Sequence, residues 1–204
     1  MTGVPAESTI LRAAGSADFL AALPRLTGMR APDSAYVVFF GVGEDSSRTL
    51  GAARIDLPSD AQLSDLSASA GWAEQVAGIA HQAPGAGSVV IVIDTEQNLT
   101  ELPASSPAGF MSMLLIGAAE DANIEFRDLL AQAPDGWAEM LLGRRAELRA
   151  LDEITSSALH DPMAQQQSLE EWRAQHPDQT SEDPKEILHL AERMTVATQS
   201  QVKP

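Results

Sequence analysis

The sequence predicts an α/β fold: a mixed β-sheet of five to six strands with flanking helices, plus a C-terminal helical extension. Two observations predict it. Between residues 9 and 142, short apolar segments typical of strands alternate with longer segments whose apolar residues recur at helical spacing. From residue 144 onwards the chain is acidic, interrupted by proline and poor in residues that build a core. We therefore expect an α/β core domain over residues 1–143 and an acidic, helix-rich extension over residues 144–204.

The first predicted elements are a short strand at Thr9–Ala13 and a helix that begins at Ser16. Serine is a favourable N-cap, and four apolar residues follow at helical spacing, namely Phe19, Leu20, Leu23 and Leu26. Because Pro24 lacks a backbone N–H, we expect a kink or a break at that position. Gly28 is the expected C-cap.

Two strands joined by a short link come next. Ala35–Phe40 is apolar on both faces, which is typical of a central buried strand, and Arg48–Leu57 alternates as a half-exposed strand does. The link Gly41–Ser47 is too short for a crossover helix, so we predict an antiparallel hairpin. Gly41-Val42-Gly43 is interpreted as part of this hairpin turn, because no third glycine and no helix follow it.

The rest of the core is predicted as two helices, a buried strand and a second hairpin. A long helix begins at Pro58-Ser59-Asp60 and ends at Pro84-Gly85, and the buried strand Ser88–Asp94 follows. The second helix, Ala108–Asp121, is expected to place four residues on one face, namely Phe110, Met113, Leu114 and Ala118. The turn Pro134-Asp135-Gly136 then joins strands at Ile124–Ala131 and Trp137–Leu142. On the central strands we expect four buried residues: Val38, Phe40, Val90 and Val92.

Composition narrows the class of function. The 204 residues include 29 acidic and 13 basic side chains, for a net charge of −16, and no cysteine. This charge argues against nucleic-acid and anionic-membrane partners and is compatible with solubility or with a basic protein partner. The missing cysteines exclude disulfides, thiolate metal sites and a cysteine nucleophile. The N-terminus has no visible signal peptide and no apolar run is long enough to span a membrane, so we expect a cytoplasmic protein.

One part of the chain carries a family resemblance. The segments that carry it are Leu11-Arg12, the run SADFLAALPRLTGM at Ser16–Met29, Pro32-Asp33-Ser34, Val37-Val38 and the run RIDLP at Arg54–Pro58. The order of these segments resembles the opening of an actinobacterial domain-of-unknown-function family, DUF4192, and Asp135-Gly136-Trp137 resembles its later hairpin. The match covers the N-terminal two thirds of the chain and departs after Leu142. The resemblance implies an α/β fold and a cytoplasmic, actinobacterial or actinophage origin; it implies no activity.

Three aspartates are the candidate catalytic residues: Asp33, Asp56 and Asp94. Asp94 ends a buried strand and Asp56 lies near the end of another, and ligands of open α/β sheets gather outside the carboxyl ends of the strands. Two carboxylates at such an edge would suit Mg²⁺, which prefers oxygen ligands. The alternative for all three is structural, because aspartate is common in turns and helix caps.

No cofactor and no resident metal are expected. The sequence has no phosphate-binding loop, no nucleophile elbow and no zinc motif, and its histidines lack metal-binding spacing: His81, His160, His176 and His189. The three tryptophans are interpreted as packing anchors, because no cluster of basic residues surrounds them in the sequence: Trp72, Trp137 and Trp172.

The extension supplies the candidate interaction residues. Leu148, Leu151, Ile154 and Ala158 are predicted to form an apolar stripe on a helix, and a second helix is predicted at Lys185–Thr198. The stripe either packs on its own core or docks into the groove of another chain.

These features favour a non-catalytic protein-interaction or accessory module that binds a protein partner or self-associates. The alternative is a small metal-dependent phosphoryl- or nucleotide-processing enzyme that uses the strand-end carboxylates. The two hypotheses differ geometrically, since the enzyme requires Asp56 and Asp94 to converge on one pocket.

Overall fold

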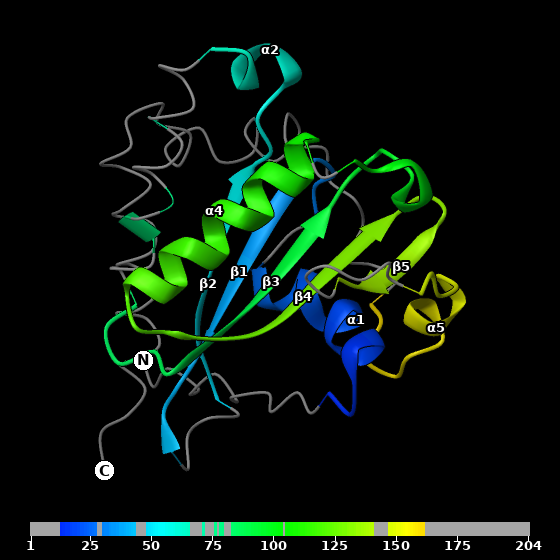
Figure 1. Ribbon diagram of the computed structural model, residues 1–204. Helices are drawn as coiled ribbons and strands as arrows, with labels where there is room; N and C mark the ends of the chain where they lie inside the picture. Colours follow the sequence, from blue (N-terminus) through cyan, green and yellow to red (C-terminus); the bar gives the residue numbers. More distant parts are fainter. Residues whose placement is uncertain are drawn as a thin grey trace, which may run out of the picture.

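The computed structural model describes residues 13–27, 30–43, 48–65, 71, 76, 78–79, 83–103, 105–140 and 147–161 (Figure 1). At its centre lies a mixed sheet in the order β2-β1-β3-β4-β5. β3 and β4 are parallel, and the other neighbouring pairs are antiparallel. The strands are β1 (Ser34–Phe40), β2 (Thr49–Asp56), β3 (Ser88–Asp94), β4 (Glu125–Ala133) and β5 (Gly136–Glu139). The predicted α/β class, with a mixed sheet and flanking helices, is confirmed.

β1 and β3 form the centre of the sheet because their side chains are apolar on both faces. All seven residues of each strand are buried, whereas β2 is mostly half-buried, as its alternating sequence predicts. The first predicted hairpin is confirmed, since β1 and β2 are antiparallel with Ser34 opposite Asp56. The four residues predicted to be buried on the central strands are buried: Val38, Phe40, Val90 and Val92.

Helices cover both faces of the sheet (Figure 1). α1 (Ser16–Thr27) and the short α5 (Asp152–Thr155) pack on one face, which we call the α1 face. α4 (Pro107–Asp121) packs on the opposite face together with Val76 and Ile79. α4 also connects β3 to β4, and a parallel pair requires a crossover connection of this kind. Each face of the sheet therefore has its own apolar core.

α1 runs through Pro24 and ends at Thr27, so the expected break at this proline is wrong. Leu20 and Leu23, each 3% exposed, anchor the helix in the core of the α1 face. Burial of two leucines contributes about 3–6 kcal/mol, which offsets the roughly 3 kcal/mol that an interior proline costs a helix.

α4 turns to the core a face that matches the predicted one only in part. Its buried residues are Ala108, Met111, Ser112, Leu115, Ile116 and Ala119. Of the four residues expected on one face, Leu114 and Ala118 are half-buried and pack against this core, whereas Met113 is 61% exposed. The prediction is wrong for Met113 because Ser112 is the only polar side chain between Pro107 and Ala119, so helical spacing alone cannot select one apolar face.

The segment 147–161, which we call the strap, lies against the α1 face. The helix expected across Leu148–Ala158 is shorter, because Arg149 forms a β-bridge with Trp137 and only α5 is helical. Ile154 is 5% exposed and belongs to the core of that face, and Leu151 packs against the same cluster. Leu148 is 38% exposed, and Ala158 is exposed. Two of the four candidate interaction residues therefore pack on the protein's own core.

Gly136 is the residue that lets the strap approach the second hairpin. Its φ is +149°, and a Cβ atom at this position would lie 2.5 Å from the backbone oxygen of Arg149. Glycine is therefore required here for the close approach of two backbones as well as for the turn.

Several predicted elements lie wholly or largely outside the described residues. They include nearly all of the strand Thr9–Ala13, the helix Lys185–Thr198 and most of the long helix after Pro58. Of that long helix the structure describes α2 (Asp60–Leu63), which Ser59 and Gln62 cap reciprocally, and four further helical residues, namely Gly71, Val76, Gly78 and Ile79. In the part of the chain that the structure describes, none of the helices has the length and apolar character needed to cross a membrane.

Candidate functional site at the carboxyl end of the sheet

A row of polar residues crosses one end of the sheet. Asp56, Ser34, Asp94 and Gln132 lie on β2, β1, β3 and β4, and each is the direct partner of the next. Side chains alternate along a strand, and residues two or four positions away pack in the core of the α1 face. All four side chains therefore belong to that face, and we call them the polar rung.

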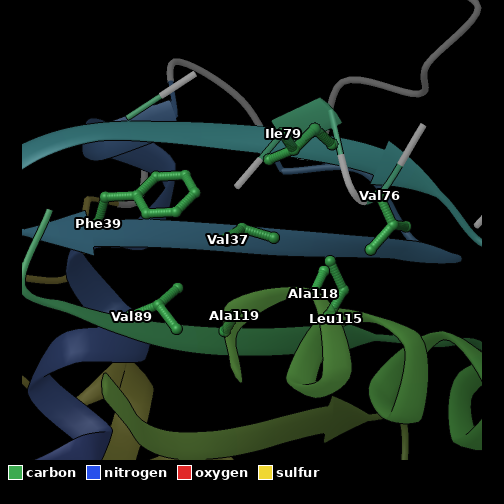
Figure 2. Close-up of a pocket in the computed structure, with 8 residues that line it drawn as sticks. All are labelled: Val37, Phe39, Val76, Ile79, Val89, Leu115, Ala118 and Ala119. Atoms are coloured by element: carbon green, nitrogen blue, oxygen red, sulfur yellow. The ribbon is translucent and has the colours of Figure 1, made fainter. Parts of the chain in front are cut away.

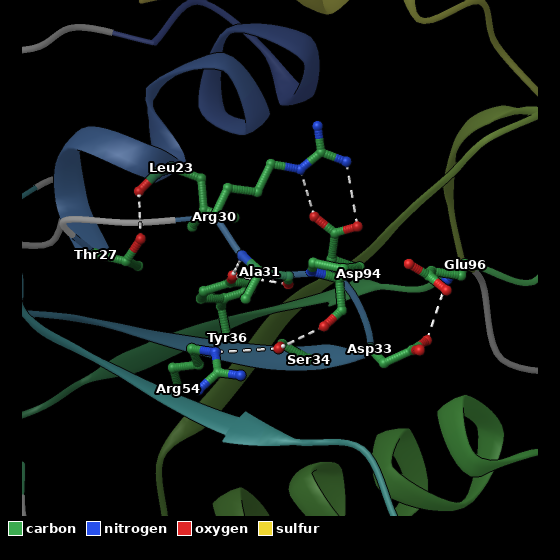
Figure 3. Close-up of polar contacts among 11 residues, drawn as sticks. Leu23, Thr27, Arg30, Ala31, Asp33, Ser34, Tyr36, Arg54, Asp94 and Glu96 are labelled. Carbon is green, nitrogen blue, oxygen red and sulfur yellow. Dashed lines mark hydrogen bonds and ion pairs between the residues drawn. The ribbon is translucent and has the colours of Figure 1, made fainter. Parts of the chain in front are cut away.

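Arg30 binds the buried carboxylate of Asp94. Arg30 Nε donates to Asp94 Oδ2 at 2.5 Å and Nη2 donates to Oδ1 at 3.2 Å, a bidentate pair (Figure 3). With its amide oriented to satisfy both partners, Gln132 accepts from Arg30 Nη2 and Nη1 at 2.9 and 3.0 Å. The side chains of Asp94 and Arg30 are 4% and 27% exposed. Burial raises the pKa of Asp94, and the interactions with Arg30 only partly oppose that rise.

Tyr36 fixes the loop that carries Arg30. Its buried hydroxyl accepts a hydrogen bond from the backbone N–H of Ala31 at 2.7 Å and donates to the Ala31 oxygen at 3.1 Å. Burial raises the pKa of Tyr36, so the hydroxyl stays protonated and able to donate at neutral pH. The loop between α1 and β1 is thereby held over the polar rung.

A second arginine occupies the other half of the polar rung. Arg54 Nε donates to Ser34 Oγ at 3.1 Å, and Arg54 Nη2 forms an ion pair with Asp56 (Figure 3). Ser34 Oγ in turn donates to the backbone oxygen of Pro32 at 3.1 Å. Both carboxylates of the rung are thus bound by arginines.

Asp33 acts as a turn residue next to the rung. Its φ is +49°, and its Oδ1 accepts from Glu96 N at 3.1 Å and from Thr95 Oγ1 at 3.3 Å. Its backbone oxygen accepts from Leu57 N at 2.7 Å. Asp33 therefore joins the start of β1 to the segments that follow β2 and β3.

The three predicted aspartates thus lie at one end of the sheet. Asp56 and Asp94 flank Ser34, so two strand spacings, or roughly 10 Å, separate their backbones. Each of the three carboxylates accepts from an arginine, a hydroxyl or a backbone N–H. Among the described residues no group of three His, Asp or Glu side chains is arranged to hold a metal ion. The arrangement therefore binds a loop to the sheet, using the same oxygens that a substrate or Mg²⁺ would need.

Sequence reasoning missed Arg30 and Gln132. A single arginine in a loop carries no pattern that predicts its partner, because Asp94 is 64 residues away. Gln132 did carry a signal, since it is a polar residue inside the apolar run Leu129–Ala133 and is 6% exposed. A buried polar side chain needs a hydrogen-bond partner, and here that partner is Arg30.

Asp135 holds a neighbouring loop in place. Its carboxylate accepts from the backbone N–H groups of Leu99 and Thr100 at 2.9 and 3.2 Å and from the Thr100 hydroxyl at 3.0 Å. Slight burial acts to raise the pKa of Asp135, but these donors outweigh it and the pKa is lowered.

Replacing Asp135 with asparagine is therefore expected to lower stability at pH 7 by about 1 kcal/mol, because the charged acceptor is lost. A lowered pKa contributes stability that is present above the ordinary value of 3.8 and is lost as the pH falls below it. The difference in melting temperature between wild type and Asp135→Asn should thus shrink as the pH falls through that region. A difference that stays constant from pH 7 to pH 2.5 would contradict the ionic role of Asp135.

An apolar hollow lies on the opposite face, between α4 and the sheet (Figure 2). It is lined by Val37, Phe39, Val76, Ile79, Val89, Leu115, Ala118 and Ala119, and it measures about 220 Å³ including its open mouth. Ligand pockets for small molecules usually start at about 300 Å³ and contain convergent polar groups, which this lining lacks. The hollow is therefore a packing gap beside two alanines.

The outer face of α4 is a second candidate surface. Phe110, Met113 and Gly117 lie on the side of the helix away from its buried residues; Met113 is 61% exposed, and Phe110 and Gly117 are half-buried. We call these three residues the α4 stripe. Exposed apolar residues that recur at helical spacing are typical of protein-docking surfaces.

Comparisons of the chain with protein-family models, with curated proteins and with solved structures found no match. The resemblance to DUF4192 therefore stays a prediction.

Proposed function

We propose that this protein is a non-catalytic protein-interaction module that binds its partner through the α4 stripe. The observation that carries the proposal is the apolar outer face of α4. A helix that covers a sheet normally presents polar residues to solvent, whereas α4 has no polar side chain on that side between Pro107 and Ala119. An exposed apolar stripe lowers solubility, and a partner that covers it would explain why it is tolerated.

The ion pairs formed by the carboxylates at the end of the sheet also support a non-catalytic function. Asp94 and Asp56 are each bound by an arginine, so both would have to leave an ion pair before they held a substrate or a metal ion. If Asp94 left its ion pair, the guanidinium of Arg30 would lose its counter-charge, and this loss is unfavourable for a largely buried arginine. These ion pairs therefore favour a structural role for the two carboxylates, in which the Asp94 pair holds the loop that carries Arg30 against the sheet.

The competing hypothesis is the metal-dependent phosphoryl- or nucleotide-processing enzyme. One observation favours it: the polar rung places Asp56 and Asp94 on either side of Ser34 at the carboxyl end of β3. Release of phosphate from nucleotides in the presence of Mg²⁺ or Mn²⁺, abolished by Asp94→Asn in a protein that remains folded, would support the enzyme and contradict our proposal.

The test of the interaction module is affinity capture by the immobilised full-length protein from an extract of the organism that makes it. Met113→Asp is expected to lose a partner that the wild type retains. Leu148→Asp is the matched control, because Leu148 is an exposed apolar residue on the strap. Thermal melts verify that both variants are folded. If Met113→Asp captures the same proteins as the wild type, the α4 stripe is not the binding surface.

A further inference from the structure

We infer that the partner of the α4 stripe is a basic amphipathic helix, which presents apolar side chains to the stripe and lysine or arginine to its acidic end. This inference rests on the proposed function and names the chemistry of the partner. It is carried by three features of α4: its apolar outer face, its acidic last turn and the open surface around Gly117.

The apolar outer face of α4 suits a second helix that packs along its length. Phe110, Met113 and Gly117 follow the spacing i, i+3, i+7, which is part of the row that a second helix contacts. A Cβ atom built on Gly117 would meet nothing within 4 Å. Gly117 thus leaves open space near Met113, and a residue without a side chain lets a second backbone approach closely. None of the described elements lies over this side of α4 in Figure 1.

The acidic last turn of α4 indicates that the partner is positively charged. Glu120 and Asp121 are exposed in the last turn of α4, which contains no basic residue, and Glu125 is exposed at the start of β4. Carboxylates at a helix C-terminus lie at the negative end of the helix dipole, where they destabilise the helix. The protein therefore carries two unfavourable charges next to its apolar stripe, and a cationic partner would relieve them.

A second copy of this chain is the less suitable occupant. The described residues include 18 acidic and 6 basic side chains. Of the basic ones, Arg25, Arg30, Arg54 and Arg149 are engaged in ion pairs within the protein. Two acidic last turns brought together in a dimer would repel each other, whereas a basic helix complements both the charge and the apolar stripe.

The test uses two synthetic peptides of 20 residues that have leucine on one helical face. One carries lysine and arginine on the other positions, and the control carries glutamate there. Binding to the full-length protein is measured by fluorescence anisotropy in 50 mM and 500 mM salt. The basic peptide is expected to bind more weakly at high salt, and the acidic peptide is expected not to bind.

Two variants separate the apolar and ionic contributions. Met113→Asp is expected to weaken binding of the basic peptide at least tenfold, with Leu148→Asp as the unchanged control. The double variant Glu120→Gln/Asp121→Asn is expected to weaken binding about three- to tenfold. The same double variant should also raise the melting temperature by about 1–3 °C, because it removes the unfavourable charges from the helix end.

The outcomes distinguish the two proposals. If a natural partner depends on Met113 but neither it nor the basic peptide responds to Glu120→Gln/Asp121→Asn, the inferred charge is wrong and the interaction module stands. If the basic peptide binds Met113→Asp as tightly as the wild type, or does not bind the wild type at all, the inference is overturned. A dimer in sedimentation velocity that Met113→Asp dissociates would replace the basic helix with a second copy of the chain.

Discussion

Replacing Asp94 with alanine is expected to lower the free energy of unfolding by about 3 kcal/mol, because it leaves the guanidinium of Arg30 without its carboxylate. The estimate lies at the low end for broken buried pairs, since the Arg30 side chain is 27% exposed and water can reach part of it. Gln132 keeps its bonds to Arg30 but supplies no compensating charge. Urea denaturation of the purified protein measures the effect.

The matched control is the double variant Arg30→Met/Asp94→Leu, which removes both charges. It is expected to recover most of the lost stability, because replacing a buried ion pair by apolar residues of similar volume is often neutral. A catalytic carboxylate behaves differently, since its removal seldom destabilises the protein. If Asp94→Ala is as stable as the wild type or more stable, the polar rung is a functional site and the enzyme hypothesis gains support.

Replacing Val90 with aspartate is expected to cost more than 4 kcal/mol and to unfold the protein near room temperature or below. Val90 lies on the central strand β3, is 9% exposed and packs in the cluster that contains Leu20 and Leu23 of α1. The direct partner of Val90 on β4 is Asp128, so a second carboxylate at position 90 would be buried beside a like charge, which is strongly unfavourable.

Val90→Ala controls for the loss of packing alone. It removes two methyl groups and should cost about 2 kcal/mol, so the remaining effect of Val90→Asp belongs to the charge. Far-ultraviolet circular dichroism against temperature measures both variants. A melting temperature for Val90→Asp equal to that of Val90→Ala would show that the side chain at position 90 reaches water.

The sequence predicted the strands well because their signal is local. Val89–Ile93 is a run of β-branched residues with no helical period, and Pro134-Asp135-Gly136 marks a turn by its own composition. The parallel pairing of β3 with β4 was left open, because it depends on α4 crossing the sheet. Local propensity contains no information about such a crossing.

The predictions from the sequence were wrong where the local structure depends on contacts with residues distant in the chain. The stripe that begins at Leu148 was expected to continue as a helix, but the backbone of Arg149 bonds to that of Trp137 at 2.8 and 2.9 Å instead. The guanidinium of Arg149 also lies 4.4 Å from the centre of the Trp137 ring. These contacts, together with the glycine at position 136, favour an extended strap over the intrinsic helical preference of its residues.

The candidate site was predicted in part. The three aspartates were found by their position at strand ends, and they do lie at one end of the sheet. Their arginine partners were not found, because a carboxylate in a sequence looks the same whether it is free or paired. Phe110 and Met113 were predicted on one face with Leu114 and Ala118, of which Leu114 and Ala118 pack against the core, because an apolar helix gives no indication of which side another element covers.

The sheet separates the molecule into two sides that can be altered independently of each other. The ion pair of Arg30 and Asp94 lies on one side of it, and the α4 stripe lies beyond a helix on the other. Substitutions more than about 10 Å apart with no shared neighbours usually have additive effects on stability. The proposed binding surface could therefore be redesigned for a new target while the ion pair of Arg30 and Asp94 on the opposite side stays unchanged.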